Sequence, residues 1–165
     1  MGTPPNNMDT PENPLQIQFD SQVPNLNADL SKLEKLVRVI CEKFRCPDAT
    51  VHIAIVDDAG IIEVHRQFLQ KDTTTDVISF DLSDEFEPGQ TFQIVVNAEM
   101  ADRQAEKRGH SSEAELALYI THGLLHNLGF DDLSPEDAKK IHETEDEILQ
   151  QLGFGIIYHK QETID

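Results

Sequence analysis

The segment from Ser112 to Leu128 constrains the fold more than any other part of the sequence, because most of its large side chains are apolar. Those side chains are Leu116, Leu118, Ile120, Leu124, Leu125 and Leu128. Ser112, with Glu115 three positions later, predicts a capping box at the start of a helix. Gly129 predicts the end, because a residue with positive φ lets the chain double back. A helix this apolar is expected at the centre of a domain.

The remaining elements follow from hydrophobic periodicity, with strands early in the chain and helices late. The spacing predicts strands over 15–19, 51–56, 77–80 and 92–96. It predicts helices over 27–44, 61–69, 98–107 and 135–152, with Asp29 or Asn27 capping the first and Ser134 the last. This order predicts an α+β fold, in which helices pack on a single small mixed sheet of about four strands.

The chain has 165 residues, the length of one compact domain. Residues 1–14 are rich in Pro, Asn and Thr and predict a disordered tail. We place one domain over 15–157 and a C-terminal tail over 158–165. No apolar run is long enough to predict a membrane span. Cys41 and Cys46 match neither a C-x-x-C site nor a disulfide framework, which predicts reduced thiols and a cytoplasmic protein.

His122 and His126 are four positions apart, so both imidazoles project from one face of the central helix. That geometry lets two nitrogens reach one ion at about 2.0–2.1 Å. The reversal at Gly129 brings Asp132 toward the same face. Three protein ligands leave one coordination position for water, as in catalytic sites. We therefore predict one divalent ion held by His122, His126 and Asp132. Zinc suits these donors best, although nickel or ferrous iron would also fit them.

The same residues can also be explained without a metal, because two histidines at this spacing occur by chance and Asp132 could instead cap the last helix. Gly123 bears on the chemistry as well. The zinc-peptidase motif H-E-x-x-H has its general base, a Glu, at this position. Either close helix packing or room for substrate explains a glycine there, and both disfavour a peptidase.

The net charge of −18 disfavours a general nucleic-acid binder, because binding to phosphates needs clustered Lys and Arg. An acidic protein that acts on RNA needs a local basic patch or a partner that delivers the substrate. The acidic run 81–87 predicts a solvated loop, with docking of a basic protein as the alternative.

Two groups of residues resemble the signatures of one known family. The first is His122, Gly123, Leu125, His126, Gly129, Phe130 and Asp131. The second is His65 and Arg66, followed by Asp72, Thr75, Asp76, Val77, Ile78, Ser79 and Phe80. Both groups resemble signatures of the YbeY family of bacterial endoribonucleases. The first is similar to H-G-x-L-H-x-x-G-Y-D-H, and the second is similar to an aromatic–Arg pair followed by D-x-x-T-D-V-L-S-F. The likeness covers roughly 15–154. Asp132 replaces the family's third metal histidine, and Phe92 and Gln93 replace its Gly-Asp pair.

The resemblance implies a metal-dependent, single-strand-specific endoribonuclease acting in ribosome quality control and in maturation of ribosomal RNA, at the 3′ end of 16S rRNA. It implies ribosomal RNA and the ribosome, or a small-subunit ribosomal protein, as partners. It places Arg66 near the metal cleft as the catalytic residue that contacts phosphate; residue type alone favours a surface salt bridge with Glu63. A metallopeptidase and a non-catalytic ribosome assembly factor with a structural metal stay open as alternatives.

The other polar residues have plainer interpretations. His52, inside a strand, is expected to meet a polar neighbour, and His65 to lie on a solvated helix face. Thr75 and Asp76 are expected to brace the strand that begins at Val77. Three further histidines have no ligand spacing to one another and are left out of the predicted site: His110, His142 and His159.

Overall fold

A computed structural model of the chain describes residues 14–86 and 89–155. The predicted tail over 158–165, His159, and all of the predicted N-terminal tail except Pro14 lie outside the described residues. The boundaries of the domain therefore stay predictions.

Four strands form one mixed sheet, as the sequence predicts. They are β1 (Gln16–Ser21), β2 (Thr50–Val56), β3 (Val77–Asp81) and β4 (Thr91–Asn97). Their order across the sheet is β1-β2-β4-β3, with β1, β2 and β4 parallel and β3 antiparallel to β4. The central strands are the most buried, and they supply Ile53, Ile55, Phe92 and Ile94 to the core.

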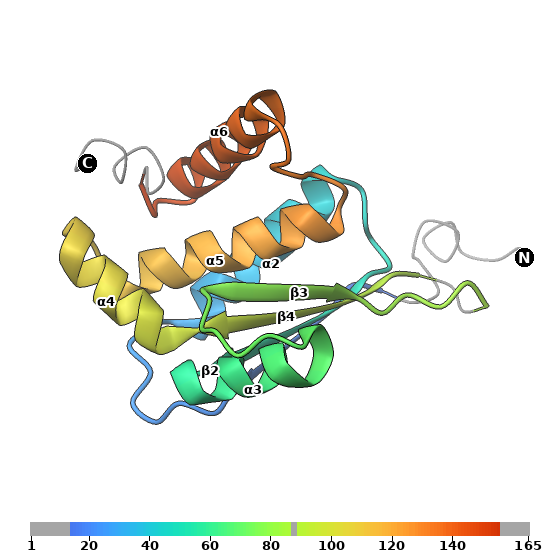
Figure 1. Cartoon of the computed structure of the whole chain (residues 1–165). Coiled ribbons are helices and arrows are strands. Elements are labelled where there is room, and N and C mark those ends of the chain that lie inside the picture. Colours follow the sequence, from blue (N-terminus) through green and yellow to red (C-terminus); the bar gives the residue numbers. More distant parts are fainter. Residues whose placement is uncertain (1–13, 87–88, 156–165) are drawn as a thin grey trace, which may run out of the picture.

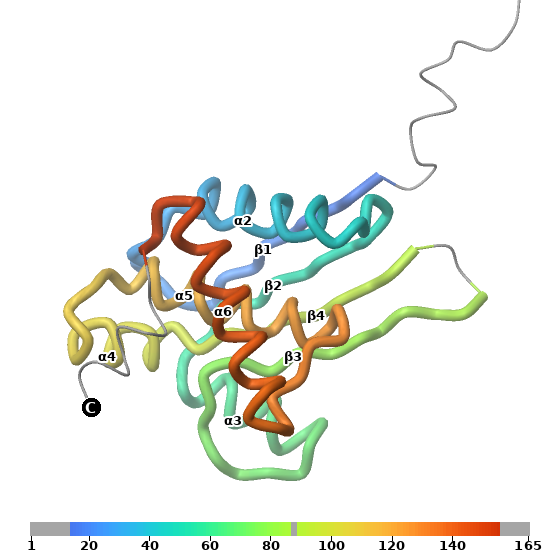
Figure 2. The backbone as a smooth tube through the Cα atoms, turned by 90° about the horizontal axis from the view of Figure 1, so that it is seen from above, coloured from blue at the N-terminus to red at the C-terminus, as the bar shows by residue number. Residues whose placement is uncertain are grey.

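Five helices cover the two faces of this sheet. They are α2 (Leu30–Lys43), α3 (Asp58–Leu69), α4 (Ala98–Arg108), α5 (Ser112–Asn127) and α6 (Pro135–Gln151). In Figure 1, α5 and α2 lie on one face, α3 lies on the other, and α6 lies over α5 on the side away from the sheet. Figure 2 shows α6 crossing above α5, and α2 beside β1. The fold is α+β, as predicted.

Helix α5 lies at the centre because it is covered by the sheet, α2, α4 and α6. Gly123 is the point of closest approach to the sheet. A Cβ added there would lie 3.0 Å from Val77 Cγ2 and 3.2 Å from Ile94 Cγ2. Close packing therefore explains Gly123, and the alternative of room for substrate is wrong, because this residue faces β3 and β4.

The helix caps follow the sequence with two exceptions. Asp29 and Ser134 cap α2 and α6 as predicted. The N-cap of α5 is Ser111, whose Oγ accepts a hydrogen bond from Ala114 N, so the capping box at Ser112 is wrong. Glu115 does not serve that box, because its buried carboxylate bonds Arg108 instead. Helix α3 begins three residues earlier than predicted because the Asp57 side chain caps it.

Among residues 14–86 and 89–155, every helix is too short or too polar to cross a membrane. The described part of the acidic run, residues 81–86, is exposed as predicted, and Glu87 lies outside the described residues.

Candidate metal centre

His122 and His126 lie on the last turns of α5, and their side chains meet as the four-residue spacing predicts. Their Nε2 atoms are 3.0 Å apart and their ring centroids are 4.5 Å apart. Both side chains are partly exposed, at 22% and 29%. The pair therefore lies at the edge of the core, where a small ligand can reach both nitrogens.

The chain reverses directly after α5 and returns an acidic side chain to this pair. Gly129 has φ of +105°, and Phe130 N donates a hydrogen bond to Leu125 O at 3.0 Å. This is a left-handed helix termination, in which glycine avoids the steric cost of a Cβ. Asp132 Oδ2 then lies 3.9 Å from His126 Nε2. The structure thus brings together the three predicted ligands.

The donor set fits a transition-metal ion. One ligand atom from each of His122, His126 and Asp132 lies within 4.8 Å of the other two. Donors that bind one zinc ion at about 2.0–2.2 Å are at most roughly 4.4 Å apart, so a small side-chain movement is enough. Asp132 can make that movement because its side chain is 46% exposed. Two imidazole nitrogens and one carboxylate oxygen suit zinc, nickel and ferrous iron.

Glu145 of α6 fixes the orientation of His122. His122 Nδ1 donates a hydrogen bond to Glu145 Oε2 at 2.5 Å, and His142 Nδ1 donates to Glu145 Oε1 at 2.9 Å. The Glu145 side chain is almost fully buried. A carboxylate on the Nδ1 side of a histidine holds the ring so that Nε2 remains available to an ion. Glu145 therefore supports the donor set from outside it.

The same contacts shift the pKa values of both partners. Burial lowers the pKa of His122, but the hydrogen bond and the charge of Glu145 outweigh burial and hold this pKa above its ordinary value. Burial raises the pKa of Glu145, but the hydrogen bonds from His122 and His142 outweigh it, so this pKa lies below the usual range. The two directions agree, and the metal-free protein favours an imidazolium–carboxylate pair.

His142 and Glu145 do not belong to the site that the sequence predicts. One signal in the sequence points to them, their i, i+3 spacing on one face of α6, while the stacking of His142 on His122, with ring centroids 6.1 Å apart, is seen only in the structure. His122, His142 and Glu145 also form a second group that could hold an ion. Both Glu145 oxygens already accept hydrogen bonds in this group, which favours a supporting role.

A cavity of about 250 Å³ opens beside His122, between α4, α5 and α6. His122, His142 and Glu145 line it on the metal side, and Arg108 and Gln104 of α4 line it as well. An ion at the three donors would therefore lie next to a cavity with its own polar groups.

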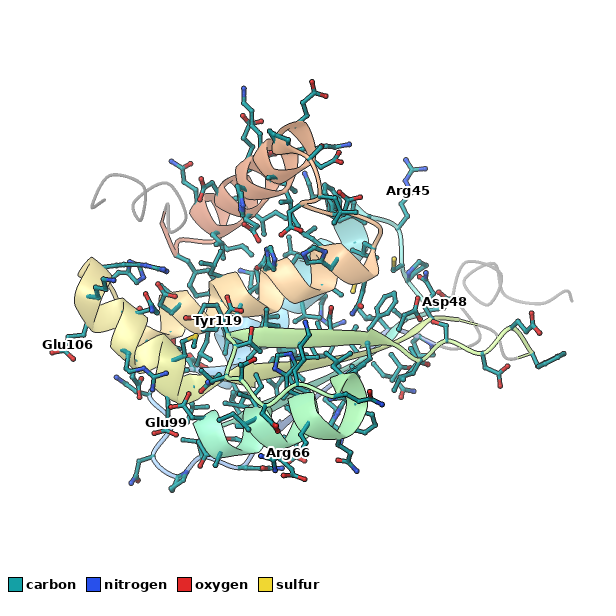
Figure 3. All side chains as sticks on the ribbon, viewed as in Figure 1. Arg45, Asp48, Arg66, Glu99, Glu106 and Tyr119 are labelled. Atoms are coloured by element: carbon teal, nitrogen blue, oxygen red, sulfur yellow. The ribbon has the colours of Figure 1, made fainter. Side chains whose placement is uncertain are left out.

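Arg66 lies on α3, on the face of the sheet opposite α5 (Figure 3). Its Nη1 is 3.0 Å from Glu63 Oε2 and its Nε is 2.7 Å from Asp72 Oδ1, so the alternative of a salt bridge with Glu63 is present. The side chain is 57% exposed and does not line the cavity beside His122. The catalytic role of Arg66 stays a prediction.

The remaining expectations have mixed outcomes. His52 Nδ1 meets Gln93 Oε1 at 2.7 Å, which confirms a polar neighbour. Asp76 accepts a hydrogen bond from Val77 N at 2.8 Å, which confirms the brace at the start of β3. The solvated position of His65 is wrong: it is 8% exposed because its Nδ1 reaches in to Thr73 O.

Comparison with known proteins points to one family. The profile of the family described as Endoribonuclease YbeY matches residues 16–153. An Endoribonuclease YbeY of Bacillus velezensis is 34% identical over 152 residues, which are 85% of this chain and 97% of that protein. One of Syntrophotalea carbinolica is 32% identical over 142 residues, covering 82% of this chain and 95% of that protein.

A solved structure has the same fold. The solution structure of TM1509 from Thermotoga maritima superposes with a TM-score of 0.59 at 25% sequence identity. The superposition covers 84% of this chain and 88% of that one. The sheet and the helices that carry the candidate centre therefore belong to an arrangement already seen in a solved structure.

Proposed function

This chain belongs to the YbeY endoribonuclease family, and from that membership we propose that it is a metal-dependent endoribonuclease that cuts single-stranded RNA. One observation carries the metal dependence. Three side chains from α5 and the turn after it converge within 4.8 Å of one another, and one of them, His122, also lines a cavity. A structural site would close all four positions of a zinc ion with protein ligands, and this site offers three.

In this proposal His122, His126 and Asp132 hold the ion, which is zinc by preference. A bound ion supplies Lewis-acid polarisation of a phosphodiester and activation of water. Glu145 holds His122 in place. For Arg66 to offer its planar guanidinium to a phosphate of the RNA, it must exchange the carboxylates of Glu63 and Asp72 for phosphate oxygens, and the RNA must extend from the ion to the α3 side of the sheet.

The biological setting is also part of the proposal. The substrate is ribosomal RNA, near the 3′ end of 16S rRNA, and the role is in rRNA maturation and ribosome quality control in the cytoplasm. A net charge of −18 opposes unaided binding to RNA, which supports delivery by the ribosome or by a basic small-subunit ribosomal protein. The exposed acidic residues 81–86 are a candidate contact for that partner.

The direct test combines elemental analysis of the purified protein with cleavage assays. A 16S rRNA 3′-end fragment and casein are incubated side by side, with and without a chelator. We expect about one zinc per chain, RNA cleavage that the chelator abolishes and zinc restores, intact casein, and loss of cleavage in a folded His126→Ala variant. RNA cleavage that persists in the chelator without bound metal would refute metal dependence.

The same assays separate the two rival functions. A metallopeptidase would degrade casein, which the packed Gly123 in place of a general base disfavours. A non-catalytic assembly factor with a structural metal would lose folding stability in His126→Ala, while a folded Arg66→Ala variant would keep full function in cells. Neither outcome is expected if the chain is a nuclease.

The carboxylate ligand gives the proposal a specific consequence. Asp132 offsets part of the positive charge of the ion, so water should be harder to activate than with three neutral imidazoles. We expect Asp132→His to bind zinc at least as tightly and to lower the pH at which cleavage rises. Glu136→His adds an exposed histidine nearby and serves as the control. Unchanged zinc affinity and an unchanged pH profile in Asp132→His would exclude Asp132 as a ligand.

A further inference from the structure

The cavity beside His122 extends to a second set of polar groups that the proposed metal chemistry does not use. Arg108, at the end of α4, bonds Glu115, and Glu115 lies seven residues before His122 on α5. Seven residues of helix span roughly 10 Å along the axis. A ligand that reaches both ends of the cavity is therefore larger than a single phosphate.

Arg108 is held rigidly at its end of the cavity. Its Nη1 lies 2.8 Å from Glu115 Oε1, its side chain is 11% exposed, and the Glu115 side chain is fully buried. His110 Nε2 lies 2.6 Å from the same carboxylate oxygen. Within residues 14–86 and 89–155, Glu115 is the only hydrogen-bond partner of the Arg108 guanidinium. Its remaining N–H groups are available to a ligand.

The lining between the two ends is mixed. Met100, Leu118 and Tyr119 supply apolar surface among the polar and charged side chains, and Figure 3 shows Tyr119 beside α4 and the start of β3. Gln104 adds a carboxamide. Apolar surface beside a few placed polar groups can receive the flat face of a small ligand and bond its edge.

The charges decide which part of an RNA fits. Glu115 already neutralises Arg108, and Glu145 is paired with His122 and His142, so Asp76 is the further carboxylate of the lining. A phosphate at the Arg108 end would therefore gain little attraction from Arg108 and would be repelled by Asp76. A nucleobase carries no charge, has two flat apolar faces for the walls, and presents hydrogen-bonding groups at its edge.

We propose that this cavity binds the base of the nucleotide next to the cleaved phosphodiester, and that Arg108 selects guanine or uracil while Gln104 helps to hold the base. This inference rests on the proposed function. The guanidinium only donates, so it pairs with the O6 and N7 of guanine or the O4 of uracil. Adenine and cytosine carry an amino group at the equivalent position, which would leave two donors facing each other.

Binding of free nucleotides tests the cavity without cleavage. The full chain in chelator is titrated with the 5′-monophosphates of guanosine, uridine, adenosine and cytidine, and binding is followed by NMR. We expect the first two to bind at least about fivefold more tightly than the last two. Equal affinity for all four, or no binding of any, would overturn the inference.

Two variants assign the selection to the named residues. Gln104→Ala removes one edge contact without breaking a protein hydrogen bond, and Arg108→Lys keeps the charge beside Glu115 but loses the guanidinium fork. We expect Arg108→Lys to reduce the difference between the two pairs of nucleotides to about twofold or less, and Gln104→Ala to weaken binding of all four. Glu106→Ala, on the outer side of α4 (Figure 3), is the control and should behave as the wild type. If Arg108→Lys does not fold, the titration of the wild type decides, and equal affinity for the four nucleotides refutes the assignment.

Mapping of cut sites separates this inference from the proposed function. In a random-sequence RNA, wild-type cuts should adjoin guanine or uracil at one fixed position, and Arg108→Lys should cut with that preference reduced. Cleavage without any base preference in the wild type would refute the inference and leave the nuclease function standing. If the wild type cuts no RNA, the proposed function fails, and the nucleotide titration still judges the cavity.

Discussion

Replacement of Glu145 by Gln tests whether this carboxylate organises the candidate metal centre. The side chain is almost fully buried and accepts hydrogen bonds from His122 Nδ1 at 2.5 Å and from His142 Nδ1 at 2.9 Å. Gln has nearly the same shape but no charge and a single acceptor oxygen. Glu145→Gln therefore leaves the packing intact and removes only the charge and one of the two acceptors.

The expected loss of stability follows from these two bonds. Hydrogen bonds to charged groups contribute about 1.5–3 kcal/mol each, and neutral ones about 0.5–1.5 kcal/mol. Each bond therefore weakens by about 1–1.5 kcal/mol, and the total loss is about 2–3 kcal/mol. The two histidines can give up their protons, so the variant leaves no uncompensated buried charge, and the larger penalty for breaking a buried ion pair does not apply.

The directions of the two pKa shifts determine how the stabilisation by the His122–Glu145 pair depends on pH. The pKa of His122 is raised, so its contribution is fully present below pH 6.5 and is lost as the pH rises through the folded-state value. The pKa of Glu145 is lowered, so its contribution is present above pH 4.5 and is lost as the pH falls through the folded-state value. The pair stabilises the metal-free protein most between these two values.

Urea unfolding in the presence of a chelator measures this effect at pH 5.5, 7.0 and 8.5. The difference in free energy of unfolding between wild type and Glu145→Gln should be largest at pH 5.5 and smaller at pH 8.5. Glu147→Gln is the matched control, because Glu147 lies on the same helix with a 67% exposed side chain. A difference below about 0.5 kcal/mol at pH 5.5, or one that does not vary with pH, would refute the reasoning.

Two further predictions concern how the scaffold holds the site. The hydrogen bond from Arg103, with those from Asn97 and Thr74, outweighs the effect of burial and lowers the pKa of Asp58 to about 2. Asp58 therefore contributes to the free energy of unfolding above pH 3.8, and this contribution is lost as the pH falls toward 2. Asp58→Asn should cost about 1–2 kcal/mol in urea unfolding at pH 6 and less at pH 3, and an equal cost at both would contradict this. Gly123→Val should lower the free energy of unfolding by about 1–3 kcal/mol, because the added methyl groups would overlap β3 and β4. The variant should also bind zinc more weakly in a calorimetric titration. A variant as stable as the wild type would exclude the tight contact.

The sequence predicted the elements well because their signals are local. Alternating apolar residues indicate β1 and short apolar runs indicate the other three strands, and the side chains of Asp29 and Ser134 mark the starts of α2 and α6. The His122–Asp132 group was predictable for the same reason, since a helix end and one glycine determine its geometry.

Contacts between distant segments could not be predicted in this way. Glu145 lies 23 positions after His122, and only the crossing of α6 over α5 brings the two together. The spacing of Ser112 and Glu115 predicts a cap because it is a local signal, while the actual partner of Glu115, Arg108, lies on the preceding helix. The sequence predicts a solvated His65 because the bond of this residue to Thr73 depends on the path of the loop after α3.

All three proposed donors lie within residues 122–132, on one helical turn and the reversal that follows it. A short peptide that forms only this turn could bind a cation before the sheet has assembled. If the ion binds the unfolded chain in this way as well as the native state, it would raise the melting temperature by less than its affinity suggests. Glu145 contacts His122 only in the folded protein. The ion would therefore stabilise the fold only by the part of its affinity that depends on Glu145.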